Sequence, residues 1–223
     1  MTDACGEFET AWDAAPEAVR RSLALAYEAL AAGGLAVGAV LTDPAGVVRA
    51  EGRNESYEDA DDDGPGTGPL RGTPLAHAEM NALAAARTGW DLGATTLWST
   101  QEPCAMCAAA ARFCGVGVVR HLAPDPWALA TGSAVPAGDA PSGGTLWLIA
   151  ANVMFLRSVA AAATGPGEPE ILRHHRSAEP ETAALHDAVP PGLPERHGSV
   201  ESWLTRWWPE LTEAARQREA RLR

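Results

Sequence analysis

The 223-residue sequence contains no lysine, and all 17 of its basic residues are arginine. This absence excludes Schiff-base chemistry and the lysine-dependent phosphate-binding loop, because both need a lysine amine. Cysteine is also scarce. The four cysteines are too few for the dense disulfide framework of small secreted proteins. The first 16 residues are acidic and lack the basic and apolar regions of a signal peptide. We therefore expect a reducing, cytoplasmic location.

Long apolar runs are nearly absent as well. The longest spans residues 146–164, but Asn152 and Arg157 interrupt it. The run therefore falls short of the roughly 20 apolar residues that a membrane-spanning helix needs. The sequence predicts a buried helix here and no association with a membrane.

Positive charge is in deficit, because the net charge is −12 and residues 1–164 hold 19 acidic and 9 basic residues. A protein that grips nucleic acid normally presents a basic surface to the phosphates. Arg216, Arg218, Arg221 and Arg223 do make the C-terminal end basic. Such a stretch is more often a solvated helix end that complements the helix dipole. We therefore expect that nucleic acid is an unlikely partner.

Two short segments carry the chemistry. His77-Ala78-Glu79 and Pro103-Cys104-Ala105-Met106-Cys107 together supply one imidazole, two thiolates and one further carboxylate. A catalytic zinc takes three protein ligands and keeps its fourth position for water, and one nitrogen with two sulfurs is such a ligand set. The pattern predicts one Zn²⁺ per chain, held by His77, Cys104 and Cys107. Glu79 then diverges from the metal and reaches the water.

Other interpretations of these residues are weaker. A lone C-x-x-C pair could be a redox centre, but a proline before the first cysteine and a His-x-Glu placed 27 residues upstream favour a metal. A structural zinc would need a fourth protein ligand, and Cys114 is the nearby candidate. It follows Cys107 by two helical turns, which puts it too far from the site if the segment is helical. We expect Cys114 to be a small buried residue instead.

The stretches HAEMNAL (residues 77–83) and EPCAMC (residues 102–107) match the H-x-E and P-C-x-x-C signature of zinc-dependent base deaminases. They resemble the cytidine deaminase superfamily, in particular the branch of guanine, guanosine, yeast-type cytosine and tRNA adenosine deaminases. The resemblance covers residues from about 18 to about 125. It implies a mixed sheet with both metal-bearing helices on one face, a hydrolase that acts on an amidine C–N bond, and a homodimer.

The pattern along the chain agrees with such a fold. Helix and strand signals alternate in the order α-β-β-α-β-α-β, which favours a layered α/β sandwich. With the mixed sheet that the resemblance implies, we expect an α/β protein, a three-layer α/β/α sandwich with a helical C-terminal extension. The expected helices and strands cover residues 16–32, 36–42, 47–54, 74–87, 94–100, 104–114 and 116–122. We expect an acidic loop at 55–72 to be too broken to pack, and either a substrate-covering loop or a surface connection at 124–144.

The C-terminal part is expected to be separate from the catalytic part. We predict a zinc deaminase domain at residues 1–164, and at residues 165–223 a linker and helical extension that packs on the core or on a partner subunit. A helix is expected at 146–163, a Gly/Pro linker at 164–180 and one terminal helix at 200–222. Three tryptophans in that terminal helix have the spacing of a buried stripe.

Roles in the site follow from chemistry and from the resemblance. Glu79 is the expected catalytic acid and base. Asn54, at the end of a predicted strand, resembles the asparagine with which the family binds its base, and its amide can both donate and accept; a turn-forming role is the alternative. The backbone N–H of Ala78 is a further candidate for substrate binding. The other five histidines are expected to be structural or on the surface.

The resulting functional hypothesis is a zinc-dependent hydrolytic deaminase of a small-molecule nucleobase or nucleoside. A purine such as guanine or adenosine is slightly favoured over cytosine. The alternatives are a tRNA-specific adenosine deaminase and a deaminase of a specialised amino-heterocycle. A degenerate site kept only as a binding scaffold is disfavoured, because Glu79 is intact and such a site would be expected to lose it first.

Overall fold

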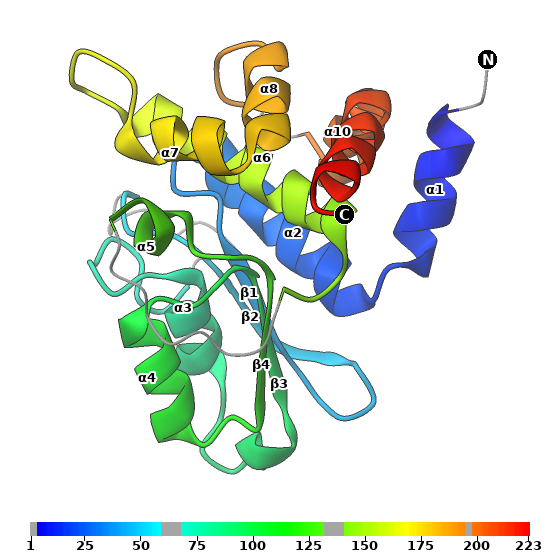
Figure 1. The fold of residues 1–223 in the computed structure, drawn as a ribbon. Coiled ribbons are helices and arrows are strands. Elements are labelled where there is room, and N and C mark those ends of the chain that lie inside the picture. The colour runs from blue at the N-terminus through cyan, green and yellow to red at the C-terminus, as the bar shows by residue number, and fades with distance from the viewer. Residues whose placement is uncertain (1–3, 59–67, 132–140, 195–197) are drawn as a thin grey trace.

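The computed structural model describes residues 4–58, 68–131, 141–194 and 198–223. Within them, one four-stranded sheet has the order β2-β1-β3-β4 (Figure 1). Its strands are β1 (Gly38–Thr42), β2 (Val48–Arg53), β3 (Thr96–Gln101) and β4 (Val118–Ala123). β1 runs antiparallel to β2 and β3, while β3 and β4 are parallel. The predicted mixed sheet is confirmed.

A tight hairpin joins β1 to β2, as the sequence predicts. The Asp43 carboxylate accepts hydrogen bonds from the N–H groups of Ala45 (2.9 Å) and Val47 (3.0 Å). Gly46 has a φ of 82°, a conformation that glycine adopts without steric cost. Turn chemistry in four residues therefore fixes the register of the first two strands.

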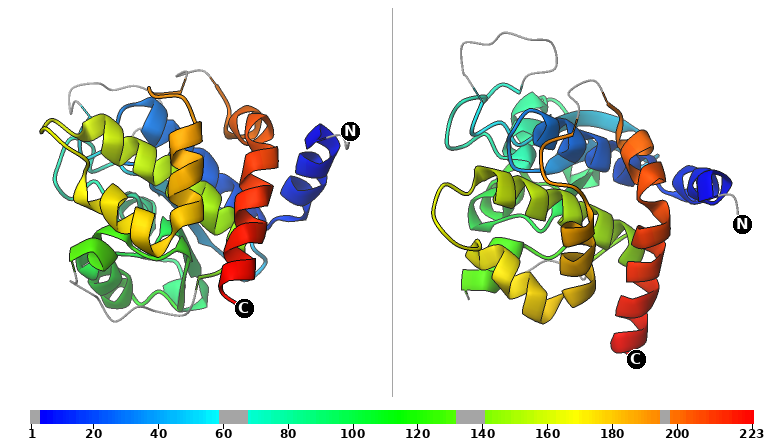
Figure 2. Two further views of the ribbon diagram at one scale, coloured as in Figure 1. Left: turned by 45° about the horizontal axis from the view of Figure 1, so that its top comes forward. Right: turned by 90° about the horizontal axis from the view of Figure 1, so that it is seen from above.

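Helices cover both faces of the sheet and make the predicted three-layer sandwich (Figures 1 and 2). One face carries α3 (Ala78–Ala85) and α4 (Ala105–Cys114), and the other carries α2 (Glu17–Ala31) and α6 (Thr145–Ala162). A 3-10 turn (Leu92–Ala94) precedes β3, and the short α5 (Pro126–Thr131) follows β4. Both helices that follow the ligand motifs therefore lie on the same face, as expected.

α6 is the core helix that the longest apolar run predicts. By length and composition it is the one described helix that could cross a membrane, yet 67% of its residues are buried inside the fold. The polar Asn152 is buried too. Arg157 donates hydrogen bonds to the carbonyl oxygens of Val189 (3.2 Å) and Pro190 (2.6 Å), so its charge fastens a later segment to the helix.

The segment after α6 differs from the expected linker and single helix. α7 (Glu170–Ala178) fills most of residues 164–180, because Ile171 and Leu172 give it a buried apolar face. α8 (Pro180–Ala188) follows directly. The expected terminal helix is broken into α9 (Val200–Arg206) and α10 (Trp208–Arg221). Pro209 explains the break, since proline lacks the N–H that a continuing helix would use and fits the start of a new one.

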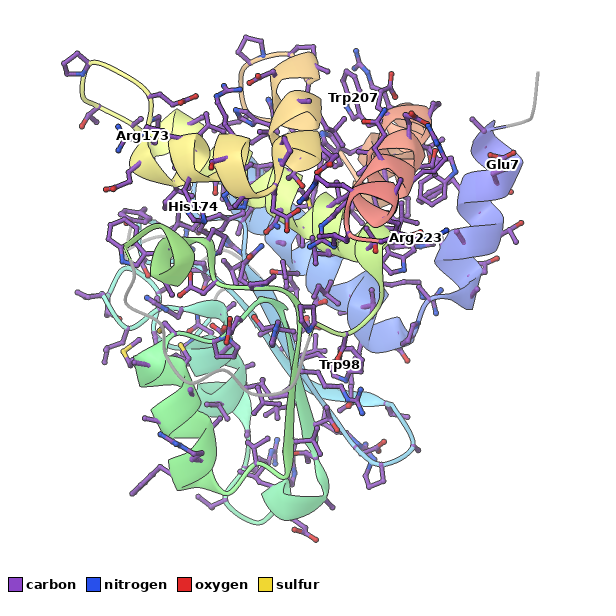
Figure 3. All side chains as sticks on the ribbon, viewed as in Figure 1. Glu7, Trp98, Arg173, His174, Trp207 and Arg223 are labelled. Atoms are coloured by element: carbon purple, nitrogen blue, oxygen red, sulfur yellow. The ribbon has the colours of Figure 1, made fainter. Side chains whose placement is uncertain are left out.

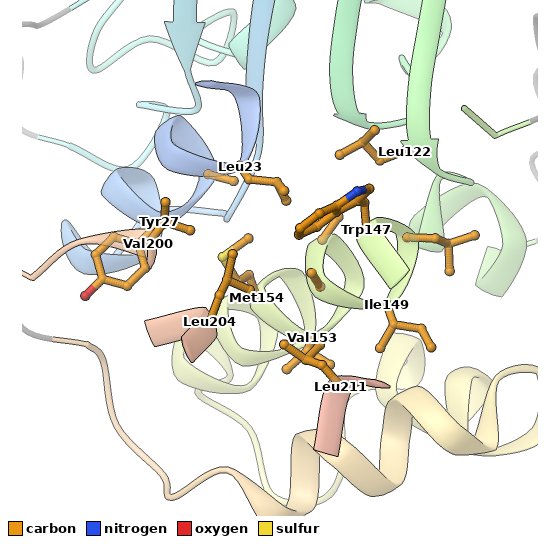
Figure 4. Close-up of a cluster of buried hydrophobic side chains, with 14 of the residues drawn as sticks. Leu23, Tyr27, Leu122, Trp147, Ile149, Val153, Met154, Val200, Leu204 and Leu211 are labelled. Atoms are coloured by element: carbon orange, nitrogen blue, oxygen red, sulfur yellow. The ribbon is translucent and has the colours of Figure 1, made fainter. Parts of the chain in front are cut away.

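α9 and α10 pack on α2 and α6 within the chain, together with α1 (Ala4–Ala14), which the sequence pattern did not reveal. Figure 4 shows Leu204 and Leu211 among α6 side chains such as Met154. The Trp208 ring meets Phe8 edge-on at 5.2 Å between centroids. Trp207 is only partly buried and lies beside α10 (Figure 3). The predicted tryptophan packing is confirmed, while the division of the chain at residue 164 stays a prediction.

Candidate active site

The three predicted metal ligands converge. His77 Nδ1 lies 3.6 Å from the Sγ atoms of both Cys104 and Cys107, and the two sulfurs are 3.6 Å apart. A tetrahedral zinc, with bonds of about 2.3 Å to sulfur and about 2.0–2.1 Å to nitrogen, holds such atoms about 3.6–3.8 Å apart. Within the described part of the chain, this is the one group of three or more potential ligands found close together. The donor set and its spacing fit Zn²⁺.

The ligands sit at helix starts, with one correction to their expected positions. His77 and Cys104 precede α3 and α4 in extended backbone (ψ 153° and 171°), rather than lying in the first helical turn. The expected helix at 74–87 therefore begins four residues late. Each helix still directs its N-terminal N–H groups toward the ligands, which favours thiolate over thiol.

The two thiols share their protons unequally. A hydrogen bond with the Cys107 side chain lowers the pKa of Cys104 to about 4, and His77 acts in the same direction. The same hydrogen bond and burial raise the pKa of Cys107. His77 has a raised pKa, mainly because of its contact with the Cys104 sulfur. Cys104 is therefore the more acidic thiol of the pair, and a divalent cation would take both sulfurs as thiolates.

Glu79 lies inside the protein beside this triangle. Its side chain is 3% exposed, and its Oε1 accepts a hydrogen bond of 3.0 Å from the Ser99 hydroxyl on β3. Burial raises the pKa of this carboxyl. A raised pKa suits a group that must both take and give a proton near neutral pH.

A cavity of about 540 Å³ opens over these residues, within the size range of small-molecule sites. Its polar wall comes from Asn54, His77, Glu79, Gln101, Cys104 and Asp125. Its apolar wall includes Leu35, Val37, Phe155, Val159 and Ile171. An apolar wall with a few polar groups suits a heterocycle that presents hydrogen-bonding edges.

The two predicted substrate contacts are close to this cavity. Asn54 is 3% exposed, lines the cavity, and accepts a hydrogen bond from the Ser56 N–H (3.2 Å) through its Oδ1. The turn-forming role is thus observed, and its amide nitrogen remains the group to offer a ligand. Ala78 is the first residue of α3, so its N–H is among those with no acceptor inside the helix.

Part of the acidic loop is packed, contrary to expectation. Glu55 is fully buried, and its Oε2 accepts hydrogen bonds from the Gly68 N–H (2.7 Å) and the Asn81 amide (3.0 Å). Asn81 also donates to the Arg53 carbonyl (3.0 Å). These bonds tie the end of β2 to α3 and so hold Asn54 near Glu79. Residues 59–67 of this loop lie outside the described residues.

The motif-based prediction did not include several residues of the cavity wall, among them Gln101, Asp125 and Trp127. These three lie at or just beyond the carboxyl ends of the parallel strands β3 and β4, where open α/β sheets commonly bind ligands. Burial raises the pKa of Asp125, whose Oδ1 accepts a hydrogen bond from the Trp127 N–H (2.9 Å). The strand-end rule could have found them. Within the 124–144 connection, residues 132–140 lie outside the described residues.

The remaining cysteine and histidine predictions have mixed outcomes. Cys114 is exposed rather than buried, because the last turn of α4 extends past the packed core. It is not part of the ligand group. His121 and His175 are buried, the latter bonded to the Ile171 carbonyl (3.1 Å). His197 lies outside the described residues.

Comparison with known proteins places this geometry in a family. The family described as the cytidine and deoxycytidylate deaminase zinc-binding region matches residues 13–122. The chain is 40% identical over 95 residues to a tRNA-specific adenosine deaminase of Haemophilus influenzae, and covers 48% of that protein's length. It is 36% identical over 118 residues to a tRNA(Ile)-lysidine synthase of Deinococcus radiodurans, but covers only 18% of it. These matches include 41% and 52% of the present chain.

Two solved structures are also similar. One comes from work on A-to-I editing by tRNA:A34 deaminases at the wobble position of transfer RNA (29% identity, TM-score 0.40, 54% of this chain and 89% of that one). The other is the guanine deaminase of Bacillus subtilis (28% identity, TM-score 0.39, 48% and 62%). The sequence matches, the sheet with its two motif-bearing helices and the His/Cys/Cys triangle lead to one assignment: the chain belongs to the cytidine deaminase superfamily.

Proposed function

We propose that the protein is a zinc-dependent hydrolytic deaminase of a small-molecule nucleobase or nucleoside. The observation that carries this proposal is the buried Glu79 carboxyl beside the His77/Cys104/Cys107 triangle, at the wall of a cavity of about 540 Å³. A buried carboxyl with a raised pKa beside a cavity is typical of catalytic sites, and a protein that used this site only as a binding scaffold would not need one.

The proposed reaction replaces a ring amine by a carbonyl. A bound zinc ion would lower the pKa of a water molecule to about 7 and so supply a nucleophile at neutral pH. Glu79 takes one proton from that water and gives it to the ring nitrogen beside the reacting carbon. It then passes the second proton to the amine, which leaves as ammonia. Ser99 keeps the Glu79 carboxyl oriented through both transfers.

The substrate is proposed to be a purine such as guanine or adenosine, somewhat ahead of cytosine. Asn54 and the Ala78 N–H are the proposed binding groups, because both adjoin Glu79 and the amide can contact a base edge. Support for a free base or nucleoside comes from the largely apolar wall, to which Phe155 and Ile171 contribute. Those two residues lie on α6 and α7, so helices of this chain cover the cavity.

An RNA substrate is the second candidate, because both of the similar curated proteins are named for tRNA. The charges argue against it. Arg216, Arg218 and Arg221 of the basic tail form ion pairs with Glu213, Glu179 and Glu181. With the net charge of −12, little positive charge is left to neutralise phosphates. A gel-shift or anisotropy titration with tRNA at low salt tests this, and tight, salt-dependent binding would reverse the preference.

A homodimer is part of the proposal. Phe113, near the end of α4, is 94% exposed, and Arg112 and Cys114 beside it are exposed as well. Covering this ring with a second subunit would remove its apolar area from water, which is favourable. We further propose that residues 1–164 form the deaminase domain and that residues 165–223 are an extension of it. Sedimentation of wild-type protein and Phe113→Ser separates a dimer through this face from a monomer.

The test of the function is ammonia release by zinc-quantified protein from guanine, guanosine, adenine, adenosine, cytosine and cytidine, with Glu79→Ala as the control. Release from one member by the wild type, and none by the variant, supports the proposal. Silence across the panel with one zinc per chain would exclude these substrates and turn attention to tRNA or a specialised amino-heterocycle.

A further inference from the structure

Gln101 ends β3 and contributes to the cavity wall without an assigned task. Its side chain is 3% exposed. Among the described residues, neither its Oε1 nor its Nε2 has a hydrogen-bond partner. Burying an unpaired carboxamide costs free energy, so native proteins rarely leave one without a ligand or a bound water molecule. An amide that is both buried and unpaired beside a cavity is therefore a candidate for binding what enters the cavity.

The geometry of β3 places the Gln101 amide on the same side of the sheet as Glu79. Side chains alternate along a strand, so Gln101 shares the face of Ser99, which holds Glu79. The two positions are about 6.6–6.8 Å apart along the strand, close to the width of a purine or pyrimidine ring. A flat ring whose reacting carbon adjoins Glu79 therefore extends toward Gln101.

The chemistry of the amide restricts what it can pair with. A carboxamide offers a donor and an acceptor side by side, and its complement is a ring edge with an acceptor beside a donor. An amidine edge, in which an amine and a ring nitrogen share one carbon, would satisfy this. In a deamination, however, the amidine amine is the group that reacts beside Glu79. The edge left for Gln101 is a cyclic amide, with a ring N–H next to a ring C=O.

We propose that Gln101 is a specificity-determining residue that hydrogen-bonds the cyclic amide edge of an amino-heterocycle, as in guanine or guanosine. The inference rests on the proposed deaminase function and narrows its substrate. Guanine and guanosine carry N1–H beside C6=O, and free cytosine carries N1–H beside C2=O. Adenosine and cytidine lack such an edge, so they are expected to be poor substrates.

The experiment compares guanine with 2-aminopurine, which keeps the amine at C2 but lacks both N1–H and C6=O. Wild-type kcat/KM should favour guanine by at least about 100-fold, because a site built for a hydrogen-bonding substrate rejects an analogue without those groups. Gln101→Met, similar in length but without the amide, should lower kcat/KM for guanine by about 10- to 100-fold and change that for 2-aminopurine by less than about threefold.

The control is Gln217→Met, which removes an exposed amide bonded to Glu213 on α10 and should change neither rate. Zinc content is measured for every variant. If Gln101→Met does not fold, wild-type enzyme is tested with 1-methylguanine, in which a methyl group replaces the N1 proton; rejection by at least about tenfold is expected.

The outcomes separate the two proposals. Equal loss on guanine and 2-aminopurine in Gln101→Met, or equal wild-type rates on guanine and 1-methylguanine, overturns the role of Gln101. Adenosine or cytidine as the best substrate does the same, while deamination itself stands. No turnover of any base by zinc-loaded protein overturns the proposed function and this inference with it.

Discussion

The two faces of the sheet bury different kinds of side chain. The face covered by α2 and α6 holds the large apolar cluster, in which Trp12, Trp147 and Trp208 make ring contacts at 5.6–6.1 Å. The face covered by α3 and α4 has a smaller apolar cluster and also buries the polar groups of the site, among them Glu79, Ser99, Gln101 and Asn81. Burial of apolar area stabilises the fold in proportion to that area, whereas burial of polar groups stabilises only when they are paired.

This difference shows how the chain combines stability with chemistry. The apolar face can supply most of the free energy of folding, because its cluster draws on residues from Phe8 to Ala215. The polar face can then keep groups such as Glu79 in an environment that raises their pKa. Substitutions on the two faces should therefore separate activity from stability.

The largest expected effect is on the polar face, in Glu79→Gln. The amide keeps the size of the side chain and can accept the Ser99 hydrogen bond, but it cannot carry a proton between water and substrate. We expect kcat to fall by about 10³- to 10⁴-fold, with zinc content and melting temperature unchanged or higher. Steady-state kinetics on zinc-quantified protein measures this. A rate within about tenfold of wild type would contradict the role of Glu79.

Next comes the apolar face, in Trp208→Ala. Trp208 is 3% exposed and packs on Phe8 and Trp147, so the variant leaves a large cavity. The free energy of unfolding should fall by about 3–5 kcal/mol. Trp208→Phe should cost less, because it keeps an aromatic ring and removes an indole N–H that has no partner among the described residues. Urea denaturation measures the free energy of unfolding of both variants. An unchanged kcat in folded, zinc-loaded protein would show that the apolar face affects stability and not activity.

Cys107→Ser removes one proposed ligand and should therefore weaken zinc binding. Changing even an outer-shell partner typically weakens metal binding 10- to 100-fold, so loss of a ligand should weaken zinc binding by at least about 100-fold. Competition with a chromogenic chelator measures the affinity. Cys114→Ser is the matched control, since that exposed thiol lies outside the ligand group and should change nothing. Full zinc retention in Cys107→Ser would refute the ligand assignment.

A smaller effect is expected for Asn54, where two roles can be separated. Asn54→Asp keeps an oxygen that can accept the Ser56 N–H, but loses the amide donor of this cavity-lining residue. If Asn54 binds substrate, kcat/KM should fall by about 10- to 100-fold in both Asn54→Asp and Asn54→Ala. A residue that only forms the turn would leave Asn54→Asp near the wild-type rate. Kinetics on both variants distinguishes the two cases.

The smallest effect is expected far from the cavity, in Arg218→Ala. Arg218 pairs with Glu179 at 2.6 Å, and both side chains retain some exposure (15% and 19%). Such pairs contribute about 0–1 kcal/mol, so the free energy of unfolding should change by less than about 1 kcal/mol. tRNA affinity at low salt should not change. A large loss of RNA binding in this variant would instead assign the basic tail to RNA.

Local signals predicted the catalytic half well. The turn at Asp43–Gly46, the apolar strands and the spacing of His77, Cys104 and Cys107 each depend on neighbouring residues, and all three matched the structure. Helix boundaries were harder, because tertiary packing decides them. α7 lies where glycines and prolines predicted a linker, and it is held by Ile171 and Leu172 in the core.

The sequence by itself predicted the family, the positions of the strands and the group of His77, Cys104 and Cys107, because each depends on short patterns whose chemistry is local. The tertiary structure decided which other groups join the site. Gln101, Asp125 and Trp127 come together with Glu79 only because β3 and β4 are parallel and end at the same edge of the sheet. Tertiary contacts also decided that residues after 164 cover the cavity through Pro169 and Ile171. No local pattern contains that information, since pairing between distant segments is a property of the whole folded chain.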